Sequence, residues 1–211
     1  MKNQPIAPRL SVQLQDWDEE VTDLLEIDDA QLHSVDLAGV IRLQVDGCRL
    51  ESVVLTGAML DKFELTDSQC VKLEAAALRT NKANLLRVTF TDCRLTGAEF
   101  ADAHIEDCTF KNVKFDEAGF RFASFKRVRF ENCILHRADF SNAKFEQVTF
   151  MGRGLTETIF MSATCKNVDV TTEDLTDVKG VLGLKGATIS EAQLLQLAPL
   201  LAAELGFQIE G

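Results

Sequence analysis

The chain has 211 residues, of which 46% are hydrophobic, and this is enough for one domain with a buried core. Its 33 acidic and 22 basic residues give a net charge of −11. No stretch approaches the ~18 apolar residues that span a bilayer, and the start lacks the apolar run of a secretory signal. These features argue against a membrane protein, and we expect a cytoplasmic one.

Residues 1–24 form an acidic lead-in to the rest of the chain. Asp16, Asp18, Glu19 and Glu20 lie close together, and residues 1–40 hold 9 acidic residues against 2 basic ones. Acidic clusters of this kind are usually solvated ends of a domain. We therefore expect residues 1–24 to be an N-terminal cap.

A period of five residues organises the chain from there on. Every fifth position from Leu50 to Leu175 is apolar in 25 of 26 cases, with Thr80 as the exception. Two residues before each of these positions, 21 of 26 residues are Ala, Cys, Val, Ser or Thr. Neither a helix nor a flat strand has this period, so the pattern predicts a solenoid with two inward positions per repeat.

The small inward residue adds a longer period. Between Val88 and Ala143 it runs Val or Cys twice and then Ala twice, so the full unit is four pentapeptides. Each coil should therefore have four sides. The composition fits such a core, because 14 Phe with no Tyr indicates an interior that takes a large side chain without a hydroxyl.

Three short segments carry a resemblance to a known family. Leu55-Thr56-Gly57-Ala58, Ala98-Glu99-Phe100 and Ala138-Asp139-Phe140 resemble the A(D/N)LXX signature of pentapeptide-repeat proteins. The resemblance covers residues 25–178 and implies a right-handed quadrilateral parallel β-helix, an all-β solenoid of about seven coils. With coils ~4.8 Å apart, we expect one inward ladder along the axis, made of Phe90, Phe110, Phe130 and Phe150.

The six cysteines have a structural explanation within this repeat. Four occupy the small inward position and two the central one, and no zinc spacing occurs. No two of them stack on adjacent coils, and Cys93 and Cys133 would be ~9.6 Å apart, beyond disulfide reach. We expect six buried thiols and no metal site.

The repeat has irregular stretches at three places. The interval from Leu37 to Leu50 is not a multiple of five, which predicts an insertion or bulge within 38–47. Between Leu73 and Thr80 the large and small residues exchange places with no change in length. In 151–155, Arg153 stands at an inward position between Gly152 and Gly154, so either Arg153 turns outward or a bulge forms.

Residues 179–211 are expected to form a linker and a C-terminal helix. The glycines at 180, 183 and 186 indicate turns rather than a phosphate loop. Ser190 followed by Gln193 predicts a capping box for a helix that ends near Leu205 and Gly206, with a kink or break at Pro199.

The apolar side of this helix is wider than one contact needs. Gln193, Gln196 and Glu204 mark a narrow polar side. The tail resembles that of family members that protect DNA gyrase and dimerise through a C-terminal helix, which implies a homodimer. The interface would use Leu194, Leu197, Leu201 and Leu205. The alternative is a split helix that folds both apolar faces onto its own coil.

We find no pattern that favours catalysis. His33, His104 and His136 are scattered, and we expect no catalytic residue and no cofactor. A non-enzymatic scaffold that binds a protein partner through its flat sides fits best. The irregular Arg153 and the basic residues Arg127 and Arg129 are the candidates for partner binding.

Two other functions remain as alternatives. Gyrase-protecting members of the family present an acidic rod that resembles duplex DNA, so a DNA mimic that binds DNA gyrase and protects against quinolones is the first. However, residues 41–150 carry 16 acidic and 16 basic residues, so the excess acid lies at the ends. Direct binding of nucleic acid is less favoured, because the aromatic residues face inward and none is left to stack on bases.

Overall fold

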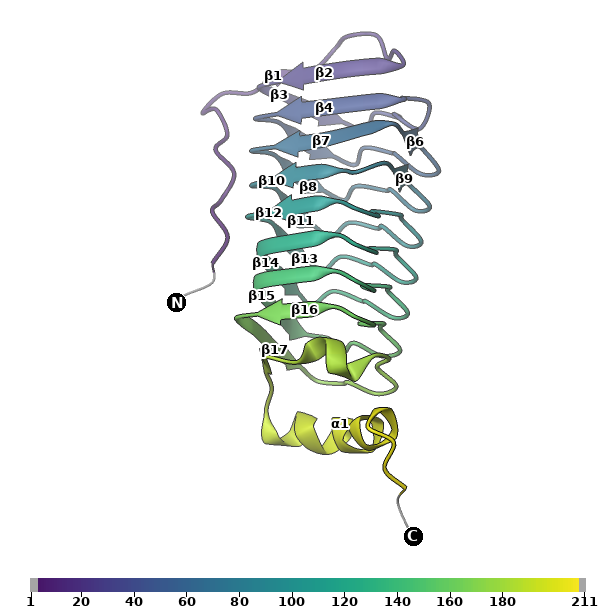
Figure 1. Cartoon of the computed structure of the whole chain (residues 1–211). Coiled ribbons are helices and arrows are strands. Elements are labelled where there is room, and N and C mark those ends of the chain that lie inside the picture. The colour runs from purple at the N-terminus through teal and green to yellow at the C-terminus, as the bar shows by residue number, and fades with distance from the viewer. Residues whose placement is uncertain (1–3, 209–211) are drawn as a thin grey trace.

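The computed structural model describes residues 4–208, which form one parallel β-solenoid closed at its C-terminal end by a helix (Figure 1). The first side is a ladder of eight parallel strands, so there are about eight coils, one more than the repeat count predicts. Its strands are β2 (Leu24–Asp28), β4 (Arg42–Asp46), β7 (Lys62–Thr66), β10 (Asn84–Leu86), β12 (His104–Glu106), β14 (Ser124–Glu131), β15 (Lys144–Gly152) and β16 (Thr164–Lys166).

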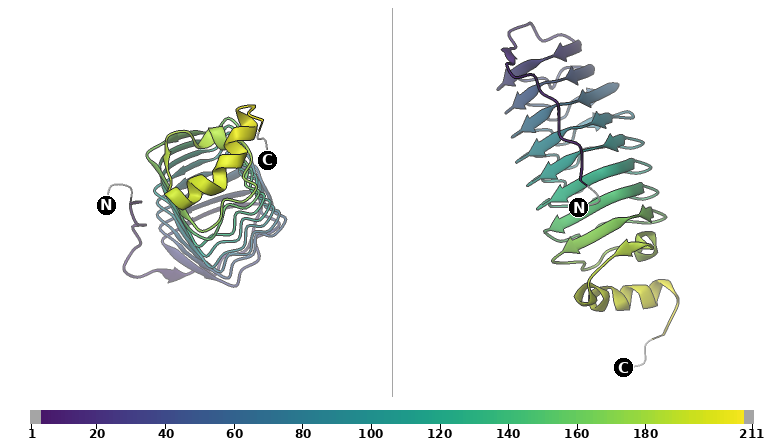
Figure 2. Two further views of the ribbon diagram at one scale, coloured as in Figure 1. Left: turned by 90° about the horizontal axis from the view of Figure 1, so that it is seen from below. Right: turned by 90° about the vertical axis from the view of Figure 1, so that its left-hand side faces the viewer.

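The other three sides follow the same coils. The second side runs from β1 (Gln15–Asp16) through β3 (Ala30–His33), β5 (Arg49–Glu51), β8 (Gln69–Val71), β11 (Thr89–Thr91) and β13 (Thr109–Lys111), and then through the second halves of β14 and β15 to β17 (Val168–Thr172) and β18 (Ala187–Thr188). The third side is held by single bridges such as Val54 to Glu74. The fourth side contains β6 (Met59–Leu60) and β9 (Arg79–Thr80) and continues with bridges. Seen along the axis, the coils superpose as a four-sided outline (Figure 2).

The coil length confirms the unit of four pentapeptides. Leu85 pairs with Leu65 on one side and with Ile105 on the other, so equivalent residues stack. Phe90, Phe110, Phe130 and Phe150 lie in one column with ring centroids 5.0, 5.2 and 4.9 Å apart and near-parallel rings. Rings on neighbouring columns meet edge to face, as aromatic quadrupoles favour.

The corners between sides impose a left-handed backbone on one residue each. At these positions φ lies near +55°, and the residues there include Asn112, Asn132 and Asn142. Asparagine tolerates this conformation better than other non-glycine residues. Phe122 occupies the same kind of corner with a φ of 61°.

The irregularity in the first coil is a deletion, not the expected insertion. Leu24 pairs with Arg42, whereas Arg42 pairs with Lys62, so the first coil is shorter than the regular coil that follows it. The shortening falls after Val40, where the first coil omits the part of the fourth side that β6 provides in the next coil. The exchange of large and small inward residues between Leu73 and Thr80 is as expected. Leu73 and Leu78, at the positions of small residues, and Ala75, at the position of a large one, are all buried.

The C-terminal end is closed by η1 (Val181–Leu184), which is a 3-10 helix, and by α1 (Glu191–Glu204). The capping box between Ser190 and Gln193 is present. The expected kink or break at Pro199 does not divide the helix, which continues through it. Gln193 bonds to the last coil and Glu204 bonds to η1, so α1 is held on both sides of Pro199. These contacts offset the loss of the hydrogen bond that proline cannot make.

The polar side of α1 faces the coil. Gln193 donates from Nε2 to the carbonyl of Thr172, and Gln196 accepts from the N–H of Leu175. Glu204 accepts from the N–H groups of Val181 and Leu182 at 2.7 and 3.0 Å. The last coil exposes backbone groups that need partners, so these polar side chains complete its edge.

Candidate protein-interaction surfaces

Ion pairs between adjacent coils cover much of the outer surface. Arg87 pairs with Asp67 at 2.5 Å, and Lys166 pairs with Glu146 at 2.6 Å, in each case one coil apart. Arg121 pairs with Asp139, also at 2.5 Å. The acidic and basic side chains of the central coils therefore neutralise one another in local pairs.

The candidate residue Arg127 belongs to this lattice. It lies at the corner between the first and second sides, donates to both oxygens of Asp107 at 2.6 and 2.7 Å, and also contacts Glu106. The hydrogen bonds to Asp107 raise the pKa of the Arg127 guanidinium. Burial alone would raise the pKa of the Asp107 carboxyl, but the bonds from Arg127 and Ile6 outweigh it and lower that pKa.

Arg129 and Arg153 lie elsewhere. Arg129 projects from the second side, where it pairs with Glu131 at 2.8 Å. Arg153 is exposed, so its side chain turns outward between Gly152, with a φ of 86°, and Gly154. The strand register stays intact there, because Gly152 still pairs with Thr172. The three arginines therefore do not form one basic patch.

The N-terminal end of the solenoid is acidic. One surface hollow of about 440 Å³ is lined by Asp16, Asp18, Glu19, Glu26 and Asp28, among others. A second hollow beside it, of about 220 Å³, includes Asp46 and Glu64 on the first side. The acidic residues of the N-terminal part of the chain therefore gather at this end of the solenoid and do not continue as an acidic surface along the central coils.

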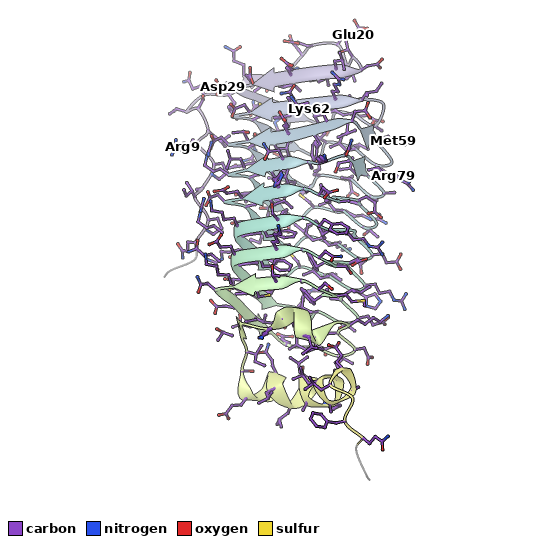
Figure 3. The ribbon with its side chains drawn as sticks, in the orientation of Figure 1. Arg9, Glu20, Asp29, Met59, Lys62 and Arg79 are labelled. Atoms are coloured by element: carbon purple, nitrogen blue, oxygen red, sulfur yellow. The ribbon has the colours of Figure 1, made fainter. Side chains whose placement is uncertain are left out.

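Large apolar side chains are exposed along the fourth side and its corner with the first side. Phe122 is 58% exposed, and Met161 and Met59 are 58% and 68% exposed. Figure 3 places Met59 and Arg79 on the edge opposite Arg9. Phe122 and Met161 lie two coils apart at one corner, since Phe122 donates to the carbonyl of Ser141, and Asn142 donates to that of Met161.

The four leucines predicted for a dimer interface separate into two groups. Leu197 is 2% exposed and Leu201 is half-buried, because both pack on the last coil. Leu194 and Leu205 are exposed. Among the described residues from α1 onward, the large apolar side chains that are exposed are Leu194, Leu195, Leu205 and Phe207, at 49%, 76%, 58% and 67%.

The histidines are dispersed, as expected from their positions. His104 lies 2.8 Å from the hydroxyl of Ser124 on the first side, while His33 and His136 lie near Glu51 and Glu157. Within residues 4–208, no three His, Cys, Asp or Glu side chains gather closely enough to hold a metal ion. No helix in that range is long and apolar enough to cross a membrane.

The structure also reveals a contact that the sequence analysis missed. The segment before β1 does not stop at the first coil but runs back along the solenoid as far as Asp107 (Figure 2). Its contacts with Asp67 and Asp107 use backbone N–H groups, which leave no mark in the sequence. The only signal is the pair Pro5 and Pro8, which favours an extended segment.

The solved structures that match this chain include two pentapeptide-repeat proteins. HetL, involved in heterocyst differentiation regulation in the cyanobacterium Nostoc sp. strain PCC 7120, is 18% identical, with 78% of this chain and 89% of HetL covered and a TM-score of 0.34. A trypsin-treated variant of QnrB1, a plasmid-mediated fluoroquinolone resistance protein, is 19% identical, with coverage of 88% and 91% and a TM-score of 0.36. Among curated proteins, none matches this chain.

Family assignment rests on the repeat itself. The family described as "Pentapeptide repeat region" matches residues 44–120, and "Pentapeptide repeats (8 copies)" matches residues 114–152. Together they cover more than half of the chain. The chain therefore belongs to the pentapeptide-repeat family.

Proposed function

We propose that this protein is a non-enzymatic scaffold that binds a protein partner, with Phe122 as the anchor of the binding surface. The observation that carries the proposal is the placement of Phe122. It is 58% exposed at a corner with a φ of 61°, where the equivalent residue one coil later is Asn142. A left-handed backbone costs a bulky residue about 1–2 kcal/mol, and an exposed ring gains nothing from the core.

An exposed aromatic ring that folding does not need is typical of a binding surface. Aromatic side chains are enriched among the residues that dominate protein interfaces. Met161 lies two coils further along the same corner and extends the apolar surface, and the surrounding ion pairs would form its polar rim. The rigid coil lattice holds these side chains in place, so a partner would meet a preformed surface.

The test compares what the protein captures from native cytosol with and without this ring. Phe122→Asn keeps a residue suited to the corner and removes the aromatic anchor. Leu24→Asn is the matched control, because Leu24 is also 58% exposed but lies on the first coil. We expect a partner retained by the wild type and by Leu24→Asn and lost from Phe122→Asn. If all three proteins capture the same partner equally, the anchor is not Phe122.

We further propose that a second copy of the chain covers the exposed apolar end of α1. Leu194, Leu195, Leu205 and Phe207 expose large apolar side chains at this end of the molecule, and exposed apolar surfaces often mark contacts. A symmetric dimer would bury this surface on both copies at once. It would also leave all four sides of each solenoid free for a partner.

The DNA-mimic alternative has one observation in its favour, the acidic hollows at the N-terminal end. A mimic that binds DNA gyrase would inhibit supercoiling or relieve its inhibition by a quinolone. Reversing the charge of Glu26 and Asp46 should then abolish the effect. Absence of any effect of the wild-type protein on gyrase would reject this alternative and leave the scaffold proposal in place.

A further inference from the structure

The N-terminal segment lies along one corner of the solenoid and is bonded to it at three points. We call residues 4–12 the strap, and we call the corner between the first and second sides the corner track. The track runs coil by coil through Asp29, Gly47, Asp67, Arg87, Asp107 and Arg127. In Figure 3 Arg9 and Asp29 lie on the same edge, and Figure 2 shows the strap passing several coils in succession.

The contacts are regular. The N–H of Ile6 donates to Asp107 Oδ1 at 3.0 Å, and the N–H of Arg9 donates to Asp67 Oδ1 at 3.0 Å. The hydroxyl of Ser11 donates to Asp29 Oδ1 at 2.6 Å. Each acceptor is therefore two coils from the next along the axis.

The spacing of the strap matches the spacing of the track. Two coils separate Asp67 from Asp107 by ~9.6 Å. Three residues of polyproline II backbone, from Ile6 to Arg9, advance by ~9.3 Å. Pro5 and Pro8 favour this conformation before the strap is bound, so little backbone freedom is lost when it docks.

Two arginines fix the positions of the carboxylates that accept these hydrogen bonds. Arg87 donates to Asp67 from Nε and Nη2 at 2.6 and 2.5 Å, and Arg127 does the same for Asp107. The Asp107 side chain is only 3% exposed and that of Asp67 13%. Each carboxylate is thus fixed and charged, with one oxygen still able to accept from the strap.

We propose that the corner track is a peptide-binding site that recognises an extended segment through its backbone N–H groups, and that the strap of the same chain occupies this site and excludes other peptides. Two of the three contacts use backbone N–H groups, so what the track recognises is an extended chain with two backbone donors three residues apart. This site is separate from Phe122 and does not rest on the scaffold proposal.

The test keeps the full chain and removes only the two donors. In Ile6→Pro/Arg9→Pro the strap loses both N–H groups, while proline preserves its extended conformation. The probe is a fluorescein-labelled peptide of residues 4–13, acetylated and amidated, followed by fluorescence anisotropy. A tethered strap has an effective concentration on the order of millimolar, so it should exclude the peptide from the wild type.

We expect saturable binding of the peptide to Ile6→Pro/Arg9→Pro and a flat titration with the wild type. Ala7→Pro is the matched control, because it adds a proline between the two donors without removing either; its titration should also be flat.

Adding Asp67→Ala to the double-proline variant should abolish binding, whereas adding Asp92→Ala, at another corner, should not. The proposal is overturned if the peptide binds the wild type equally, fails to bind the double-proline variant, or ignores Asp67→Ala.

Discussion

At the scale of single residues, the repeat assigns each position one environment, and neighbours two apart can differ completely. Phe120 is 1% exposed and stacks between Phe100 and Phe140, whereas Phe122 stands at a corner and is 58% exposed. The five-residue period predicts the first environment directly, because inward positions repeat. The period gives no structural reason for a phenylalanine at a corner. A functional reason for Phe122 is therefore the one to test.

This contrast gives a direct prediction for stability. Phe120→Ala should lower the free energy of unfolding by about 3–5 kcal/mol, because it leaves a cavity in a stacked column. Phe122→Asn should leave it unchanged or raise it by about 1 kcal/mol, since it relieves an unfavourable backbone conformation. Urea denaturation followed by circular dichroism measures both, and equal losses in the two variants would contradict the inward assignment.

The cysteines should be chemically inert in the folded protein. Burial raises the pKa of the Cys93, Cys108 and Cys133 thiols to about 12 and that of Cys165 to about 11. Reactivity follows the thiolate, so Ellman's reagent at pH 8 should react with the native protein slowly and first at half-buried Cys165. All six thiols should react at once in guanidinium chloride, and fast reaction of several thiols before unfolding would contradict the buried placement.

The corner-track carboxylates should make stability fall at acid pH. The hydrogen bond from Arg87 lowers the pKa of Asp67, and the bonds from Arg127 and Ile6 lower that of Asp107 against the effect of burial. The unfolded chain therefore takes up protons first, near the ordinary pKa of about 3.9, and the stabilisation is lost as pH falls from there through the folded values. Urea midpoints measured at pH 7, 4 and 3 should fall more steeply for the wild type than for Asp67→Asn/Asp107→Asn. Parallel profiles would assign the acid sensitivity to other groups.

At the scale of elements, α1 shows what sequence patterns can and cannot decide. The capping box and the end of the helix were predictable, because they depend on local hydrogen bonds at Ser190 and Gly206. The orientation of the helix was not. Hydrophobicity alone would place the leucines on the coil, but the unpaired backbone edge attracts Gln193, Gln196 and Glu204 to that face. Leu197 follows them inward, and Leu195 is left outside.

The exposed side of α1 predicts the state of assembly. Sedimentation equilibrium at micromolar concentration should give twice the 23.4 kDa of one chain. Leu195→Glu/Leu205→Glu should give a folded monomer, because both side chains lie on the free surface and neither supports the coil. Gln208→Glu serves as a control that adds charge nearby at an exposed polar residue. A wild-type monomer would reject the dimer.

At the scale of the whole molecule, the solenoid was predictable, whereas its short first coil and its strap were not. A strict period over most of the chain permits few other folds, and each coil repeats the contacts of its neighbours. The short first coil was misjudged, because the interval from Leu37 to Leu50 has two possible origins. It can be two complete pentapeptides with an insertion, or three pentapeptides with a deletion, and the sequence alone does not distinguish them. The strap was invisible because its partners Asp67 and Asp107 lie far along the chain and its donors are backbone groups.

The strap also sets an order of events during synthesis. It leaves the ribosome before the coils that it contacts, since Asp107 comes 101 residues after Ile6 in the chain, and its partner Arg127 comes one coil later still. Coils can stack one after another as they emerge, since each needs only the coil before it. The strap alone must wait until the coils of Asp107 and Arg127 exist, so its closure should mark the moment when the N-terminal half of the nascent chain becomes resistant to proteases.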